Sequence, residues 1–162
     1  MSRTTTDFDR DVAVCRTMLH GGSRSFFMAS LLLPRALRDP ASALYAFCRL
    51  ADDAVDLPTQ RENAVDGLRQ RLALAYAGCP RPIPADRALA VVVERFAIPP
   101  TLHEALLEGF AWDAAGRRCE DVEDLLAYAV RVAASVGAMM ALLMGVRDAE
   151  ALARACDLGV AM

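Results

Sequence analysis

The chain has no lysine: all 18 of its basic residues are arginine. The formal net charge is only −3, which excludes the basic surplus that electrostatic nucleic-acid binding needs. Histidine is scarce: the chain has only His20 and His103, too few to suggest a histidine-based metal centre. The five cysteines are scattered and form no C-x-x-C pair, so they predict reduced thiols rather than a disulfide framework or a zinc site.

The sequence also lacks the alternation of apolar and polar residues that is typical of strands, and it has no internal repeat. Hydrophobic residues make up 55% of the chain, enough for buried helices and a real core. We therefore expect an all-α protein with one domain over residues 1–162. The apolar stretch 132–146 is shorter than the roughly 20 residues of a membrane-spanning helix, and we interpret it as a buried core helix. Residues 1–10 are polar, so we expect no signal peptide.

Local capping signals predict where several helices begin. Ser23 is a candidate N-cap of a short apolar helix that ends at Pro34. The pair Asp39-Pro40 is a typical helix start, and Asp148 opens a last helix. That last helix is still apolar at Met162 and meets no capping residue, so we expect the chain to be truncated there.

Three carboxylates stand in an otherwise apolar run, Arg49-Leu-Ala-Asp-Asp-Ala-Val-Asp56. On a helix, Tyr45, Arg49, Asp52 and Asp56 share one face, and Asp53 lies beside it. The apolar flanks indicate a buried helix, where unpaired carboxylates would be costly. A hard divalent metal ion would neutralise them. The alternative is a solvated acidic helix end, which is common.

A second polar element precedes this helix. Ser23, Arg24 and Ser25 place two hydroxyl groups and a guanidinium at a predicted helix N-terminus, where free N–H groups attract anions. Ordinary N-capping by Ser23 is the alternative. Together with the acidic stripe, the element suggests a diphosphate held by protein donors on one side and by Mg²⁺ on the other.

These residues resemble the squalene/phytoene synthase family, with the closest similarity to bacterial phytoene synthases. The segment 128–137 is similar to the Y-x-x-x-V-A-G-x-V-G segment of the family, with Ala134 in place of its usual glycine. Asp113 stands where members carry an aspartate. The other elements that carry the resemblance are Ser23–Phe27, Leu32–Pro34, Tyr45–Asp56 and Ala155–Met162.

The resemblance implies an isoprenoid-synthase-type helical bundle around an apolar cavity, of which residues 1–162 are the N-terminal part. It implies a prenyltransferase that joins two geranylgeranyl diphosphates head to head to give phytoene, in carotenoid biosynthesis. The implied cofactor is Mg²⁺ or Mn²⁺. A squalene- or dehydrosqualene-type synthase that uses farnesyl diphosphate and a truncated, non-catalytic helical partner subunit remain as alternatives.

The resemblance also implies a role for each site residue. Asp52 and Asp56 would bind the metal, Asp53 would support them, and Tyr45 would lie near the reacting carbons. The expected diphosphate contacts are Ser23, Arg24, Ser25 and Arg49, and the expected further substrate contacts are Asp113, Val132, Val136 and Gly137.

A second aspartate motif is not found in these residues, so we expect the 162 residues alone to be inactive. The expected partner is a prenyl diphosphate, with no nucleic acid. We expect a cytoplasmic protein, with peripheral membrane contact and dimerisation through an exposed core face as open alternatives.

Overall fold

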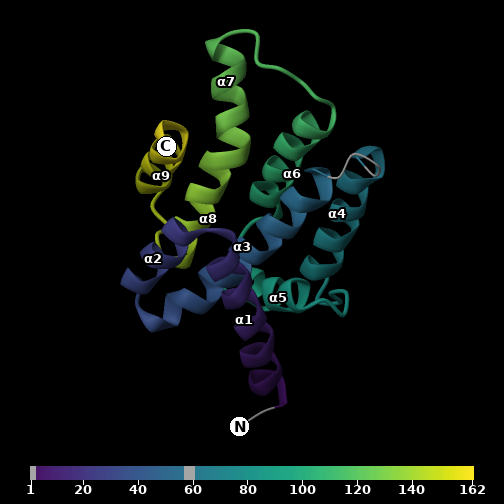
Figure 1. Ribbon diagram of the computed structural model, residues 1–162. Coiled ribbons are helices and arrows are strands. Elements are labelled where there is room, and N and C mark those ends of the chain that lie inside the picture. Colours follow the sequence, from purple (N-terminus) through teal and green to yellow (C-terminus); the bar gives the residue numbers. More distant parts are fainter. Residues whose placement is uncertain (1–2, 57–60) are drawn as a thin grey trace. The chain divides into compact units, whose positions relative to one another are not determined.

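The computed structural model describes residues 3–56 and 61–162, and for residues 3–6, 55, 56 and 61–63 it describes the backbone alone. Every secondary-structure element in these ranges is a helix, which confirms the predicted all-α class (Figure 1). The chain divides into two compact units, which are considered separately below. The first unit contains Met1–Leu50 and Arg71–Ala97, and the second contains Ala51–Gln70 and Ile98–Met162.

The first unit is built from helices α1 (Arg3–Gly22), α2 (Arg24–Leu32), α5 (Pro84–Phe96), most of α3 (Arg35–Asp56) and the end of α4 (Arg61–Tyr76). Helix α1 packs against α5. Apolar side chains at helical spacing bury one face of α1, α3 and α5. This core includes Val12, Cys15, Leu19, Leu44, Phe47, Leu72, Leu89 and Val92.

Buried charges in the first unit are paired. The Arg87 guanidinium, on α5, donates to the Asp11 carboxylate, on α1, with an Nε–Oδ2 distance of 2.8 Å. Arg71 donates to Asp86 over 3.0 and 2.6 Å, and its guanidinium also lies over the Phe47 ring. Because a buried carboxylate without a partner would be strongly destabilising, these bidentate pairs fix how the helices are joined.

Helix α3 begins at Arg35, so the predicted start at Asp39-Pro40 is wrong and Pro40 lies inside the helix. The first turn forms just after Pro34, whose carbonyl accepts from the backbone N–H groups of Leu37 and Arg38. Asp39 does not cap the helix; its carboxylate pairs with Arg16 of α1. A long-range ion pair thus replaced the local capping role that the sequence suggested.

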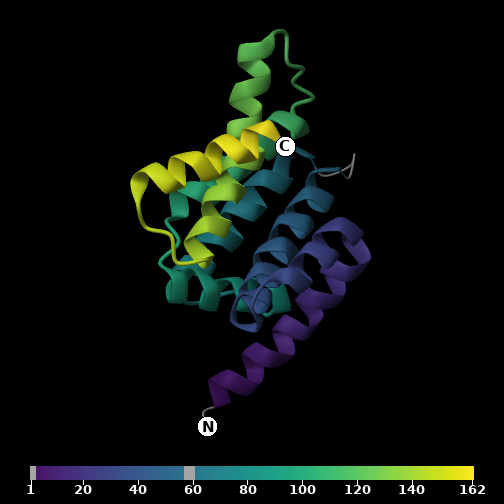
Figure 2. The same cartoon turned by 90° about the vertical axis from the view of Figure 1, so that its left-hand side faces the viewer.

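The second unit contains α6 (Pro100–Ala114), α7 (Val122–Ala129), η1 (Val130–Ala134), α8 (Ser135–Leu143) and α9 (Ala149–Ala161). The helix predicted over residues 121–144 is present as α7, η1 and α8 in succession, with η1 as a π-helical turn. Helix α9 begins at the predicted N-cap, Asp148, and runs back along η1 and α8 (Figure 2).

The core of the second unit lies between α6, α8 and the helices around them. Residues 122–143 are long and apolar enough, by length and composition alone, to cross a membrane. Met139, Leu142 and Leu143 at the end of this stretch are nevertheless buried in the unit, as the core-helix interpretation predicted. Val122 and Leu126 near its start are exposed.

Candidate functional site

The predicted acidic stripe lies on a regular helix. Helix α3 continues without interruption to Asp56, so its spacing places Tyr45, Arg49, Asp52 and Asp56 on one face. Asp52 is half-buried and Asp53 is exposed. The side chain of Asp56 lies outside the described residues, and the paired ligation of a metal by Asp52 and Asp56 therefore stays a prediction.

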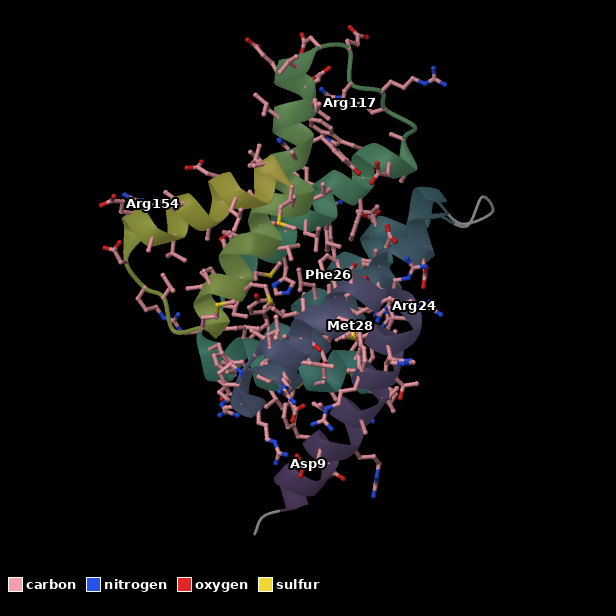
Figure 3. All side chains as sticks on the ribbon, turned by 60° about the vertical axis from the view of Figure 1, so that its left-hand side comes forward. Asp9, Arg24, Phe26, Met28, Arg117 and Arg154 are labelled. Atoms are coloured by element: carbon pink, nitrogen blue, oxygen red, sulfur yellow. The ribbon has the colours of Figure 1, made fainter. Side chains whose placement is uncertain are left out.

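The serine-rich element forms the start of α2, as predicted. The Ser23 hydroxyl accepts a hydrogen bond from the Phe26 backbone N–H at 3.3 Å, which makes Ser23 the N-cap. The Ser25 hydroxyl lies 3.2 Å from that of Ser23. Arg24 is exposed beside them on the first turn (Figure 3). Two neighbouring hydroxyl groups therefore lie at the positive end of α2, and an exposed arginine is in its first turn.

Tyr45 lies close to this serine-rich element within the first unit. Its ring meets the Phe26 ring edge to face, with centroids 6.2 Å apart. A side chain on Gly22, at the end of α1, would collide with the Tyr45 hydroxyl. The absence of a Gly22 side chain thus makes room for Tyr45, and the ring of Tyr45 lies beside the start of α2.

In the second unit, the Tyr128 hydroxyl of α7 donates a hydrogen bond to Asp113 Oδ2 of α6 at 2.9 Å. Burial, then the bond to Asp113 and its negative charge, then the charge of Asp52, raise the pKa of Tyr128 to about 12. Tyr128 therefore remains protonated at neutral pH. The negative charge of Asp52 contributes to the raised pKa of Tyr128, so Asp52 and Asp113 both act electrostatically on this hydroxyl.

The spacing of residues along the sequence assigns no role to Tyr128. The available signal was its position at the start of the segment 128–137, which carries part of the resemblance to the family. Its partner, Asp113, was assigned to substrate binding, but the two residues stand on different helices. Their hydrogen bond was therefore not readable from spacing along one helix.

Two of the predicted substrate contacts, Gly137 and Val132, take part in helix packing. A Cβ atom on Gly137 would lie 2.6 Å from the Ala155 carbonyl oxygen of α9. The missing side chain of Gly137 thus lets α9 approach closely, and the predicted substrate contact of Gly137 stays a prediction. Val132 contacts α6, where a side chain on Gly109 would collide with it. Val136 is half-buried, and the substrate contacts of the two valines stay predictions.

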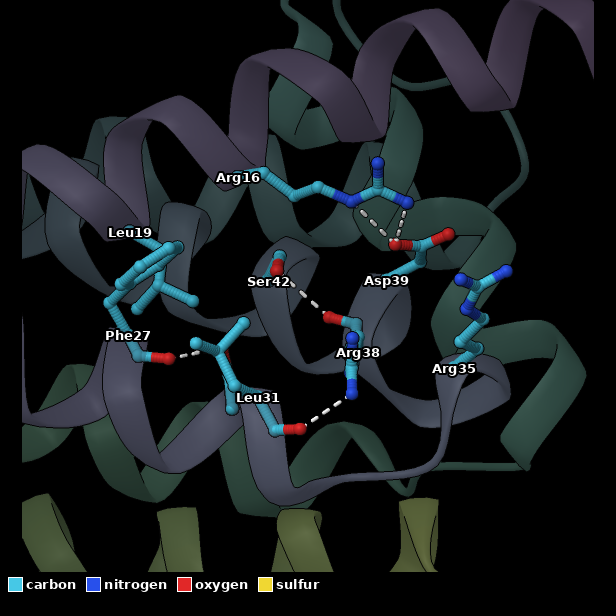
Figure 4. Close-up of a pocket in the computed structure, with 9 residues that line it drawn as sticks. Arg16, Leu19, Phe27, Leu31, Arg35, Arg38, Asp39 and Ser42 are labelled. Atoms are coloured by element: carbon cyan, nitrogen blue, oxygen red, sulfur yellow. Dashed lines mark hydrogen bonds and ion pairs between the residues drawn. The ribbon is translucent and has the colours of Figure 1, made fainter.

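The first unit has a cavity of about 440 Å³ that does not include the predicted site residues (Figure 4). Arg38 on its wall donates to the carbonyl oxygens of Leu31 and Leu33 at 2.5 and 2.8 Å, and so caps the end of α2. The cavity therefore lies at a helix junction and not at the acidic stripe. Its lining residues are Arg16, Leu19, Phe27, Ser30, Leu31, Arg35, Arg38, Asp39 and Ser42.

The donor chemistry of the stripe fits Mg²⁺ or Mn²⁺, which prefer carboxylate oxygens and often share their coordination with substrate phosphates. Among the side chains that the structure describes, no group of three or more His, Cys, Asp or Glu residues could hold a metal ion by itself. Asp52 and Asp56 stay the predicted ligands of a metal ion that would share its coordination with a diphosphate.

Comparison with known proteins agrees with this geometry. The model of the squalene/phytoene synthase family matches residues 19–162. The chain belongs to this family. It is 57% identical over 157 residues to a phytoene synthase of Rhodobacter capsulatus, which covers 95% of this chain, and 57% identical over 162 residues to a phytoene synthase of Cereibacter sphaeroides. The resemblance stated from the motifs is confirmed.

Solved structures show the same fold. A dehydrosqualene synthase matches with a TM-score of 0.87 and 31% identity, and a squalene synthase from Alicyclobacillus acidocaldarius matches with a TM-score of 0.88 and 29% identity. The matches cover 98% and 96% of this chain, but only 56% and 59% of those chains. The chain spans about half the length of the curated relatives it matches, since 46% of each of the two phytoene synthases is covered.

Proposed function

We propose that these residues form part of a phytoene synthase, a prenyltransferase that joins two geranylgeranyl diphosphates head to head. The observation that carries the proposal is the 57% identity to the phytoene synthase of Rhodobacter capsulatus across 95% of this chain. Local chemistry supports it, because one face of a single helix carries an arginine and two aspartates, the side chains that suit a diphosphate and its metal ion.

The first unit supplies the anion-binding groups. In the proposed complex, the hydroxyls of Ser23 and Ser25 and the guanidinium of Arg24 hold diphosphate oxygens at the start of α2. Arg49 adds a forked, charge-assisted contact one turn before Asp52. These donors stabilise the negative charge that grows on the diphosphate as it leaves.

The carboxylates of Asp52 and Asp56 would hold Mg²⁺ or Mn²⁺, with Asp53 as a supporting charge. When bound, the metal ion supplies Lewis-acid neutralisation of the leaving diphosphate. Asp52→Asn should therefore lower turnover by about 100-fold or more, in the range observed when one oxyanion-stabilising group is removed.

Tyr128 supports the reaction as a neutral group. Because its hydroxyl proton is donated to Asp113 and its pKa is about 12, it can present only oxygen lone pairs to a substrate. Such an electron-rich group stabilises an allylic cation without capturing it as an anion would. Tyr45, beside the serine-rich element, is proposed to lie near the reacting carbons, and Val132 and Val136 to line the prenyl tunnel, which must be dry to protect the cation from water.

The test is a chimera that joins residues 1–162 to the remaining part of the Rhodobacter capsulatus enzyme. With geranylgeranyl diphosphate and Mg²⁺, we expect phytoene, detected by chromatography and mass spectrometry. The Asp52→Asn chimera is the matched negative control. A chimera that folds but makes no prenyl product from either geranylgeranyl or farnesyl diphosphate would refute the proposal.

The same assay decides between the proposed substrate and the second candidate. The matched solved structures are squalene-type synthases, which favours farnesyl diphosphate, but at 31% and 29% identity they are less similar than the phytoene synthases. A clear preference for farnesyl diphosphate would establish the second candidate. If the 162 residues instead bind an intact synthase and add no activity, they act as a helical partner subunit, which is the third alternative.

We also propose that the protein acts in the cytoplasm, with peripheral membrane contact, because a C40 hydrocarbon product has no solubility in water. No nucleic acid is proposed as a partner. Sedimentation of the chimera with lipid vesicles tests the membrane contact: recovery in the supernatant at every lipid concentration would exclude it.

A further inference from the structure

Two guanidinium groups lie over the ring of Trp112, at the end of α6. The Arg117 Cζ atom is 3.6 Å from the ring centroid and the Arg131 Cζ atom is 4.6 Å from it. Both distances fall well inside the roughly 6 Å range of cation–π attraction. Trp112 is thus held by cations from the segment after α6 and from η1 (Arg117 is labelled in Figure 3).

Each cation is itself anchored. The Arg117 guanidinium donates to Asp124 Oδ1 at 2.7 Å, and that of Arg131 donates to Glu108 Oε1 at 3.0 Å and to the Ala127 carbonyl at 2.8 Å. The buried Nε of Arg131 has no hydrogen-bond partner among the described residues. The π face of the Trp112 indole lies against this guanidinium and can partly compensate the buried N–H.

The clamped indole continues into the predicted site. The rings of Trp112 and Tyr128 are stacked, with centroids 6.2 Å apart and an interplanar angle of 29°. Trp112 also immediately precedes Asp113, the acceptor of the Tyr128 hydroxyl. A movement of Trp112 would therefore displace both partners of this hydrogen bond, the Tyr128 ring with its hydroxyl donor and the Asp113 carboxylate that accepts.

We propose that Trp112, clamped by Arg117 and Arg131, is a positioning residue that fixes the hydrogen bond between Tyr128 and Asp113. The physical claim stands on the contacts within the second unit, and its consequence for catalysis rests on the proposed function. A merely structural role, in which the stack only joins α6 to α7, would leave the ionisation of Tyr128 unchanged in a folded variant.

The direct test is the ultraviolet titration of Tyr128 in the 162-residue chain, measured at the tyrosinate band as the difference from Tyr128→Phe. We expect Trp112→Leu to lower the pKa of Tyr128 from about 12 towards the ordinary value of 10, because both burial and the hydrogen bond to Asp113 raise it. Trp112→Phe retains an aromatic face and should restore most of the shift. A pKa that stays at about 12 in folded Trp112→Leu would overturn the proposal.

Arg117→Gln gives a second, surface variant in case Trp112→Leu does not fold. Removal of a positive charge would by itself raise a tyrosine pKa, so a fall in this variant can come only from lost packing. Arg95→Gln removes a comparable guanidinium–ring contact, with Phe96 in the first unit, and is the matched control. An unchanged or higher Tyr128 pKa in Arg117→Gln would count against the clamp.

Kinetics of the chimera test the catalytic consequence. We expect Trp112→Leu to lower kcat by about 10- to 100-fold with little change in KM, since misplacing a reacting group by about 1 Å can cost 100-fold. An unchanged kcat would refute the positioning role. If the unmodified chimera is inactive, the proposed function fails, while the titration still decides whether the clamp holds Tyr128.

Discussion

Replacing Gly159 with alanine tests how closely α9 approaches the neighbouring helical segment. A Cβ atom at this position would lie 2.7 Å from the Ala133 carbonyl oxygen, 2.8 Å from the Ala134 Cα atom and 2.9 Å from the Ala133 carbonyl carbon. All of these atoms belong to backbone, so no side-chain rotation relieves the contact. Helix α9 must move away from η1 to admit the methyl group.

Two opposing effects set the size of the change. Alanine is favoured over glycine inside a helix by about 1 kcal/mol. Overpacking a close interface costs about 1–3 kcal/mol, and three contacts with rigid backbone place this substitution at the upper end. We therefore expect Gly159→Ala to lower the free energy of unfolding by about 2 kcal/mol.

Gly67→Ala is the matched control. Gly67 lies inside α4, in the part that belongs to the same unit, and nothing lies within 4 Å of a Cβ atom built on it. The helix preference alone should then raise the stability by up to about 1 kcal/mol. For a chain of this size, the expected shifts of Tm are a fall of about 4–8 °C for Gly159→Ala and a rise of about 2–4 °C for Gly67→Ala.

Circular dichroism at 222 nm, followed against temperature and against urea, measures both variants. Equal or greater stability of Gly159→Ala relative to the unmodified chain would refute the close approach of α9 to η1. Gly137→Ala gives an independent check from the other side of the helix pair, because its Cβ would meet the Ala155 carbonyl oxygen at 2.6 Å.

Three further predictions concern pH, substrate binding and activity. Burial lowers the pKa of His103 from 6.5 to about 4. Between pH 6.5 and pH 4, His103 therefore binds a proton in the unfolded chain but not in the folded chain. The contribution of His103 to the free energy of unfolding should be complete above pH 6.5 and fall by about 3 kcal/mol as the pH drops to 4. Urea unfolding at a series of pH values measures this loss, and an equal loss in His103→Gln would contradict the assignment to His103. Arg49→Lys in the chimera should raise KM or lower kcat by about 10-fold, because an ammonium cannot form the guanidinium fork, and unchanged kinetics would assign Arg49 a structural role. The 162 residues by themselves should form no phytoene from geranylgeranyl diphosphate and Mg²⁺, because they carry one acidic pair; sustained product formation would show a second metal-binding set.

The features that the sequence predicted correctly are local. The caps at Ser23 and Asp148 follow from side chains that bond to backbone N–H groups three residues away, and both were confirmed. The all-α class follows from the apolar period of every segment. The shared face of Arg49 and Asp52 needs only a regular helix, because its geometry is fixed by residues three and four apart.

The tertiary structure decided what depends on contacts between distant segments. Arg16 of α1 drew Asp39 into an ion pair, and α3 begins upstream of the cap that the sequence offered. The bond from Tyr128 to Asp113 joins two helices, and its strength depends on burial that no short motif encodes. Gly137 shows the same limit: a missing side chain leaves space, but only the packed fold shows that the backbone of α9 lies against this position.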